Sequence, residues 1–167
     1  MKHIVTVLAI CLAAIVPGAA QTRLGVINMQ RAISNTAEIR KAIVDVTNKY
    51  RPRQQEIEQL QSELQSIQQQ INSGKLSPAA EQQLRADGAT RERQAQRKDQ
   101  DLREDVDRER NEMVGHATQR MQGIVQKIAD EKGLDVIVDT SNTVYFKAGL
   151  DITDAAIAEY DKAYPVK

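Results

Sequence analysis

The chain has 167 residues, and its 23 lysines and arginines are balanced by 23 aspartates and glutamates. Because this balance leaves no overall positive field, the composition argues against a protein that recruits nucleic acid or another polyanion. The chain contains one cysteine and two histidines, which leaves few side chains for a thiol, metal or acid–base centre.

Residues 1–20 have the pattern of a secretory signal peptide. Lys2 precedes an apolar run over residues 4–16, and small residues lead to an expected cleavage point near Ala20. A retained membrane anchor fits less well because the apolar run is short, and lipid attachment at Cys11 fits less well because the bulky Ile10 precedes it. Export would remove the only cysteine and Lys2, which leaves 22 basic and 23 acidic residues and a net charge of −1.

A short strand and the start of a long helix are predicted next. Within residues 23–29, Leu24, Val26 and Ile27 are apolar, and Gly25 permits the close approach of another segment. Residues 34–36 offer N-cap candidates, and Asn35 followed by Glu38 fits a capping box. We therefore expect a strand followed by a helix that begins near residue 35.

A heptad pattern predicts one long amphipathic helix that continues to about residue 71. Its apolar side chains recur at alternating spacings of four and three residues and form one stripe, here called the seam: Ile39, Ile43, Val46, Tyr50, Ile57, Leu60, Leu64, Ile67 and Ile71. The pattern is interrupted at Arg53, next to Pro52, which lacks a backbone donor and bends helices. We predict a hinge at Pro52 and Arg53, with a local kink of no functional consequence as the alternative.

A second helix is predicted to return antiparallel after a turn at residues 72–75. Ser77 is placed to cap it and Pro78 to begin it, and the helix is expected to end at Lys132 before Gly133. Over residues 85–101 the only apolar side chains are alanines, and longer ones return from Leu102 onward. We therefore predict an arm closed at its base and loose at its tip, with a binding surface of Leu60, Leu64, Ile67, Ile71, Leu84, Arg85 and Arg91. For the two arginines, an ordinary solvated helix face is the alternative.

The C-terminal part is predicted to complete a small body. Residues 134–139 and 143–146 read as a hairpin joined by residues 140–142, and with the first strand they would form a sheet with two exposed edges. Thr153 is expected to cap a terminal helix, with Ile152 and Ile157 as a hydrophobic staple. Because so small a body buries little surface, we expect oligomerisation or barrel closure through Val26, Ile27, Val136, Val138, Val144 and Phe146.

The predicted fold class is α+β, with a small β-sheet body formed by residues 21–35 and 132–167 and an antiparallel coiled-coil hairpin arm formed by residues 36–131. Three features follow one another along the chain: a strand at residues 24–29, a charged helical hairpin, and an ending at residues 134–139 and 151–154. In this order of elements the chain resembles the Skp/OmpH family of periplasmic chaperones. The resemblance implies a homotrimer in the periplasm, whose strands form a central β-barrel. It further implies that three helical arms surround a cavity that holds unfolded outer-membrane proteins without ATP. Members of that family are strongly basic whereas this chain is neutral, so contact with lipid or lipopolysaccharide stays open and no residues are assigned to it.

These observations predict a binding protein rather than an enzyme. The mature chain would keep His116 alone, and it shows neither a phosphate-binding glycine loop nor metal-ligand spacing, so we expect no catalytic residue, cofactor or metal site. The leading hypothesis is an ATP-independent holdase that prevents aggregation of unfolded outer-membrane proteins through many weak contacts. The alternative is a periplasmic coiled-coil spacer or assembly scaffold with a fixed protein partner. Nucleic acid is not an expected partner.

Overall fold

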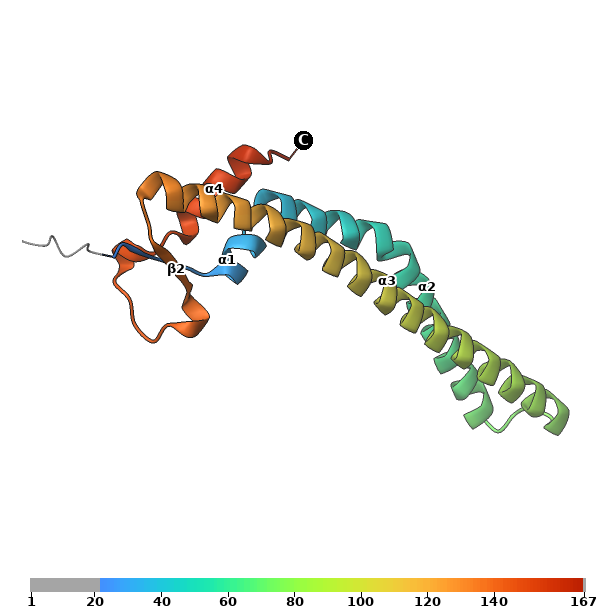
Figure 1. Cartoon of the computed structure of the whole chain (residues 1–167). Coiled ribbons are helices and arrows are strands. Elements are labelled where there is room, and N and C mark those ends of the chain that lie inside the picture. The colour runs from blue at the N-terminus through green and yellow to red at the C-terminus, as the bar shows by residue number, and fades with distance from the viewer. Residues whose placement is uncertain (1–21, 167) are drawn as a thin grey trace, which may run out of the picture.

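Two long helices project from a small body in the computed structural model, which describes residues 22–166 (Figure 1). The expected signal peptide therefore lies outside the described residues. Helices α2 (Ala37–Asn72) and α3 (Pro78–Lys132) run antiparallel and form the arm. The body contains strands β1 (Leu24–Ile27) and β2 (Val136–Asp139), helices α1 (Met29–Ser34) and α4 (Thr153–Ala163), and the 3-10 turns η1 (Thr140–Asn142) and η2 (Ala148–Leu150).

The sheet of the body has two parallel strands, with Leu24 opposite Val136 and Val26 opposite Val138. Since side chains alternate along a strand, these four residues share one face of the sheet, and Gly25, Ile27 and Ile137 share the other. A Cβ atom at Gly25 would lie 2.8 Å from Leu134 Cδ1 and 3.3 Å from Ile137 Cγ1 on the inner face, so a larger residue there would require these side chains to shift. The strand predicted over residues 23–29 is therefore present in shortened form.

The predicted hairpin is wrong, because residues 143–146 form no strand. The Asp139 carboxylate accepts hydrogen bonds from the backbone N–H groups of Ser141, at 2.8 Å, and Met29, at 3.1 Å. These bonds hold the chain in the η1 turn and against α1, so that it does not reverse alongside β2. Val144 and Tyr145 consequently lie in an irregular segment with exposed fractions of 106% and 80%.

The hydrophobic core lies where the arm joins the body. Apolar residues at helical spacing on α3 pack against α1, the start of α2, β1 and α4: Ala117, Met121, Ile124, Ile128, Ile27, Ala32, Ile39, Ile152, Ala156 and Tyr160. The phenolic group of Tyr160 is fully buried and donates to Glu38 Oε2 at 2.6 Å. Burial, followed by this bond, raises the pKa of Tyr160 to about 12. The root of the arm is thus part of the core of the body.

The helix ends follow the predicted pattern in α3 and, apart from the capping box, in α2, but the start of α4 does not. Ser77 caps α3, Pro78 begins it, and Gly133 ends it in the left-handed conformation at φ 60°, as the sequence predicted. Of the N-cap candidates at residues 34–36, Thr36 caps α2 by accepting from the Ile39 N–H at 3.3 Å, whereas Asn35 ends the unpredicted helix α1. The predicted capping box at Asn35 is therefore wrong.

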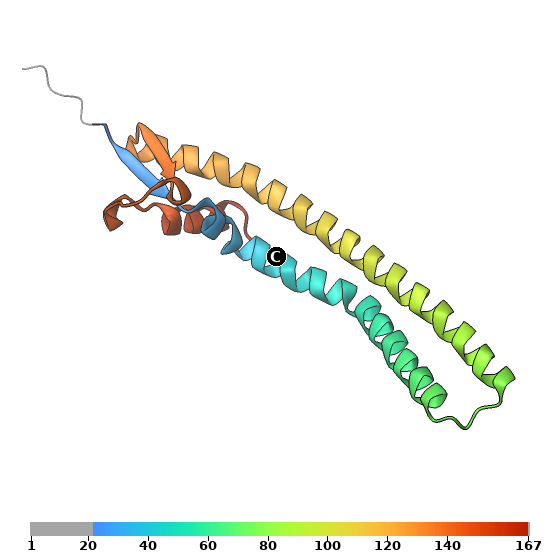
Figure 2. The ribbon, with the colours of Figure 1, turned by 90° about the horizontal axis from the view of Figure 1, so that it is seen from below.

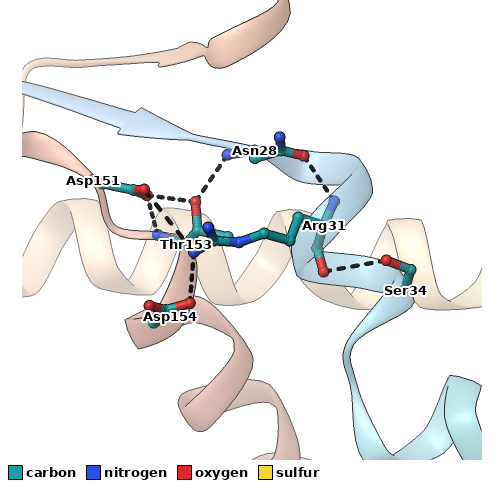
Figure 3. A network of polar contacts seen from close by, with 6 residues as sticks. All are labelled: Asn28, Arg31, Ser34, Asp151, Thr153 and Asp154. Carbon is teal, nitrogen blue, oxygen red and sulfur yellow. Dashed lines mark hydrogen bonds and ion pairs between the residues drawn. The ribbon is translucent and has the colours of Figure 1, made fainter. Parts of the chain in front are cut away.

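Thr153 does not cap α4 as predicted, and its hydroxyl joins two segments of the body instead. It accepts from the Asn28 N–H at 2.9 Å and donates to the Asp151 carboxylate (Figure 3). Arg31 of α1 reaches Asp154 at 2.6 Å in the same network. These contacts hold the start of α4 against the end of β1. The network therefore joins the N-terminal and C-terminal segments of the body.

Helix α2 changes direction midway along its length (Figure 2). Pro52 lies inside the helix, where it cannot donate to the carbonyl group four residues earlier. The bend expected at this position is present, and movement about it stays a prediction.

Candidate functional site

The candidate functional features among residues 22–166 are surfaces of the body and of the arm. Within residues 22–166 no three His, Cys, Asp or Glu side chains gather in a way that could hold a metal ion. His116 lies on the exposed surface of α3. In the same part of the chain, no helix has the length and apolarity needed to cross a membrane.

An apolar groove lies on the outer face of the sheet. It has a volume of about 490 Å³, and its lining includes Leu24 and Val26 of β1, Val138 of β2, and Tyr145 and Phe146 of the following loop. Leu24 and Val136 on the same face are 44% and 46% exposed, although both are large apolar side chains. The hydrogen-bonding edge of β2 away from β1 carries no further strand among the described residues.

The residues predicted to mediate oligomerisation divide between this groove and other places. Val26, Val138 and Phe146 line the groove, and Val136 and Val144 are exposed beside or beyond it. Ile27 is 2% exposed and belongs to the internal core, because it points to the opposite side of the sheet from Val26. The prediction for Ile27 is therefore wrong. Leu24 was missed because only the pairing of β1 with β2 shows which alternate residues face outward. Tyr145 was missed because residues 143–146 were expected to form a strand, in which Val144 and Phe146 would share a face.

The arm is packed further toward its tip than the sequence predicted. Ile57 and Leu60 are 2% and 8% exposed, and Leu64, Ile67, Ile71 and Leu84 are half-buried. The small residues of α3 explain this packing, since a Cβ atom on the buried Gly88 would lie only 3.3 Å from Ile67 Cγ2. A return helix poor in large apolar residues can approach closely, so the predicted loosely packed tip is wrong for this structure.

The two arginines predicted for the binding surface are both paired. Arg85 forms an ion pair with Glu81 within α3 at 2.6 Å, and Arg91 forms one with Glu63 across the arm. The structure therefore places Arg91 between the helices, where it helps to join them, and leaves Arg85 on the surface of α3.

The bend at Pro52 is braced by polar contacts. Arg53 donates to Asp105 at 2.6 Å, and the Glu109 carboxylate accepts from Lys49 at 2.7 Å and from the Tyr50 hydroxyl at 2.9 Å. These donors hold the pKa values of both carboxyl groups below their ordinary range, because each bond favours the ionised form. The sequence contained a signal for these ion pairs, because Lys49 and Arg53 are four residues apart and Asp105 and Glu109 have the same spacing.

The ion pairs between α2 and α3 all lie on one side of the arm. Five such pairs join the helices: Glu38–Arg120, Lys49–Glu109, Arg53–Asp105, Glu56–Lys98 and Glu63–Arg91. On α2 these residues follow spacings of 11, 4, 3 and 7, and on α3 spacings of 7, 7, 4 and 11. Because such spacings return to the same face of a helix, the pairs form one continuous row. We call this side the bridged face.

The opposite side of the arm carries an apolar groove of about 430 Å³. Val46, Tyr50, Leu102 and Val106 line its floor, and Thr47, Arg51, Gln54 and Glu58 of α2 form a rim at spacings of 4, 3 and 4. None of the ion pairs described between α2 and α3 crosses this side.

Two exposed apolar residues extend this groove toward the body. Ile43, one turn before Thr47 on the same stripe of α2, is 53% exposed. Val114 on α3 is 39% exposed and lies about 140° around the helix from Glu109 and about 120° from Arg120, away from the bridged face. The pairs Glu38–Arg120 and Lys49–Glu109 place Ile43 and Val114 at the same level of the arm. We call the groove together with Ile43 and Val114 the open face.

Comparisons with known proteins agree with this architecture. Residues 23–160 match the sequence model of the family described as outer membrane protein (OmpH-like). The chaperone protein Skp of Salmonella typhimurium is 24% identical over 154 residues, which cover 92% of this chain and 95% of that protein, and Skp of Salmonella typhi gives the same values. A crystal structure of an OmpH-like protein from Caulobacter crescentus has the same fold, with a TM-score of 0.70 and 16% identity over 90% of each chain. The match over residues 23–160 shows that the chain belongs to the OmpH-like family.

Proposed function

We propose that this protein is a periplasmic, ATP-independent chaperone that holds unfolded outer-membrane proteins and prevents their aggregation. The observation that carries the proposal is the match to Skp chaperones across 92% of the chain, which includes both the arm and the body. The structure supplies a long arm with an apolar groove. Such a surface can hold a client by weak contacts, without a chemical step.

The chaperone is proposed to act as a homotrimer. The outer face of the sheet is apolar around Leu24, Val26 and Val138. An isolated two-stranded sheet with a free edge is only marginally stable in water. Pairing of β2 with another copy would cover both the edge and the groove. Several arms around one client would then raise the effective concentration of the binding surfaces.

Light scattering tests both parts of this proposal. The mature chain, beginning at Gln21, is mixed without nucleotide with a urea-unfolded outer-membrane β-barrel protein as the denaturant is diluted. Aggregation should fall as the chaperone is raised to an excess over the client, and an equal mass of an unrelated soluble protein should have no effect. Unchanged scattering would refute the holdase function. Multi-angle light scattering of the chaperone alone should give the mass of three chains, and a monomer would refute the shared cavity.

A scaffold role is the second candidate, and the bridged face favours it. Ion pairs join the helices from Glu38–Arg120 near the root to Glu63–Arg91 toward the tip, as expected for a stiff spacer. Amide hydrogen exchange separates the two roles. A holdase should gain protection along the arm when an unfolded barrel protein is added, whereas a spacer should show the same exchange with and without it.

A further inference from the structure

We propose that the open face of the arm is the surface that holds an extended client segment with alternating apolar side chains, as in an unfolded strand of an outer-membrane β-barrel. This inference rests on the proposed function and specifies which side of the arm performs it. The bridged face is occupied by five interhelical ion pairs. An apolar client side chain placed there would have to desolvate charged groups without replacing their partners.

The open face presents the opposite chemistry. Its floor consists of Val46, Tyr50, Leu102 and Val106, and Ile43 and Val114 continue it as half-exposed apolar side chains. On its rim, the amide of Gln54 donates to Glu58 at 3.1 Å, and Thr47 donates its hydroxyl to the Ile43 carbonyl at 2.8 Å. The surface is therefore apolar at its centre and polar at its edge, which suits a segment whose side chains alternate between the two types.

The length and area of the open face fit an extended client segment better than a folded protein partner. From Ile43 to Glu58 the face runs 15 residues along α2, or about 22 Å, which matches about seven residues of extended chain. Strands of outer-membrane barrels have about ten residues of alternating hydrophobicity, so one strand spans this face. A strip about 22 Å long and about 10 Å wide offers roughly 200 Å² per arm, well below the roughly 800 Å² per partner of a stable folded complex. Contact with one arm is consequently weak, and several arms are needed to retain a client.

The chain offers a matched pair of positions to test this assignment. Gln54 and Gln59 are both exposed on α2, and each donates its amide to the glutamate four residues later at 3.1 Å. They lie about 140° apart around the helix, so that Gln54 is on the rim of the open face and Gln59 is not. Because the only cysteine, Cys11, lies in the expected signal peptide, Gln54→Cys and Gln59→Cys each give the mature chain a single thiol.

Each variant is labelled with a benzophenone maleimide and irradiated with a urea-unfolded eight-stranded outer-membrane barrel protein as the probe. Cross-linking to the barrel protein should be at least about fivefold greater from Gln54→Cys than from Gln59→Cys, because the photoprobe reaches only contacting atoms. Equal yields, or more from Gln59→Cys, would overturn the assignment while leaving a chaperone that still suppresses aggregation. Cross-links between chaperone chains from Gln54→Cys without client would also overturn it, because a second copy would then occupy the open face.

A second comparison uses variants without labels. Ile43→Gln with Val114→Gln should weaken binding of a fluorescent unfolded barrel by about tenfold, because two half-exposed apolar side chains no longer lose water on contact. Val44→Gln is the control, since Val44 is 56% exposed but points away from α3. An equal loss in both variants would overturn the assignment. Failure of the unmodified chain to suppress aggregation would instead refute the proposed function and, with it, this inference.

Discussion

Replacement of Ile57 by alanine tests whether the outer half of the arm is packed. Ile57 is 2% exposed in the seam, whereas Ile43, also on α2, is 53% exposed. Ile57→Ala removes three buried carbon atoms, worth roughly 2.4 kcal/mol at about 0.8 kcal/mol each. Any cavity left behind adds to this cost. The same change at Ile43 loses at most about half of the transfer term, and the higher helix propensity of alanine returns roughly 0.4 kcal/mol.

The expected destabilisation is therefore about 2–3 kcal/mol for Ile57→Ala and below about 1 kcal/mol for Ile43→Ala. Urea unfolding followed by far-UV circular dichroism measures the overall effect. Amide exchange of residues 54–64 shows whether the loss is local to this part of α2. If both variants cost the same, or if Ile43→Ala costs more, the outer seam is not packed as described here and the arm is loose beyond its root.

Three further predictions concern the body and the braced bend. Tyr160→Phe should destabilise the body by about 1–2 kcal/mol in thermal unfolding, because Glu38 loses a buried donor while the ring remains. No effect would show that this bond is not formed. Asp105 and Glu109 have pKa values lowered by folding, so their contribution to stability is present above their unfolded values near pH 4 and is lost as the pH falls through the lower folded values. Acid titration of helicity should therefore show a smaller loss in the double variant Asp105→Asn, Glu109→Gln, and identical titrations would contradict this account. Gly25→Ala should cost roughly 1–3 kcal/mol, because the new Cβ would meet a leucine methyl group at 2.8 Å, whereas an unchanged melting temperature would mean that the sheet has room there.

The sequence predicted the long elements well because their signals are local. The apolar spacing of α2, the Ser77–Pro78 start of α3 and Gly133 at its end each act within a few residues. Local signals gave a wrong prediction where a residue distant in the sequence determines the structure of the segment. Residues 143–146 have strong strand propensity, yet the bonds from Met29 and Ser141 to Asp139 direct the chain elsewhere.

The functional surface was harder to predict than the helices. Counting large apolar residues indicated a loose tip, but Gly88 allows Ile67 to pack closely, and close approach depends on size rather than hydropathy. The two faces of the arm follow from the register between α2 and α3, which the sequence of either helix alone does not contain. Once Lys49 and Glu109 are paired, helical spacing alone separates the bridged face from the open face.

Removal of the arm beyond its root tests most directly the central claim that the arm holds the client. The pairs Glu38–Arg120 and Lys49–Glu109 put residue 43 opposite residue 115, so residues 43–115 can be deleted and the helices joined by a short glycine-rich turn. The shortened chain keeps the body and the buried Ala117 and Met121 of α3, while the whole open face is removed. It should assemble as the full chain does but bind a fluorescent unfolded barrel protein at least about 100-fold more weakly, since the multivalent contacts of the arm are lost. Undiminished affinity would show that the body, and not the arm, holds the client.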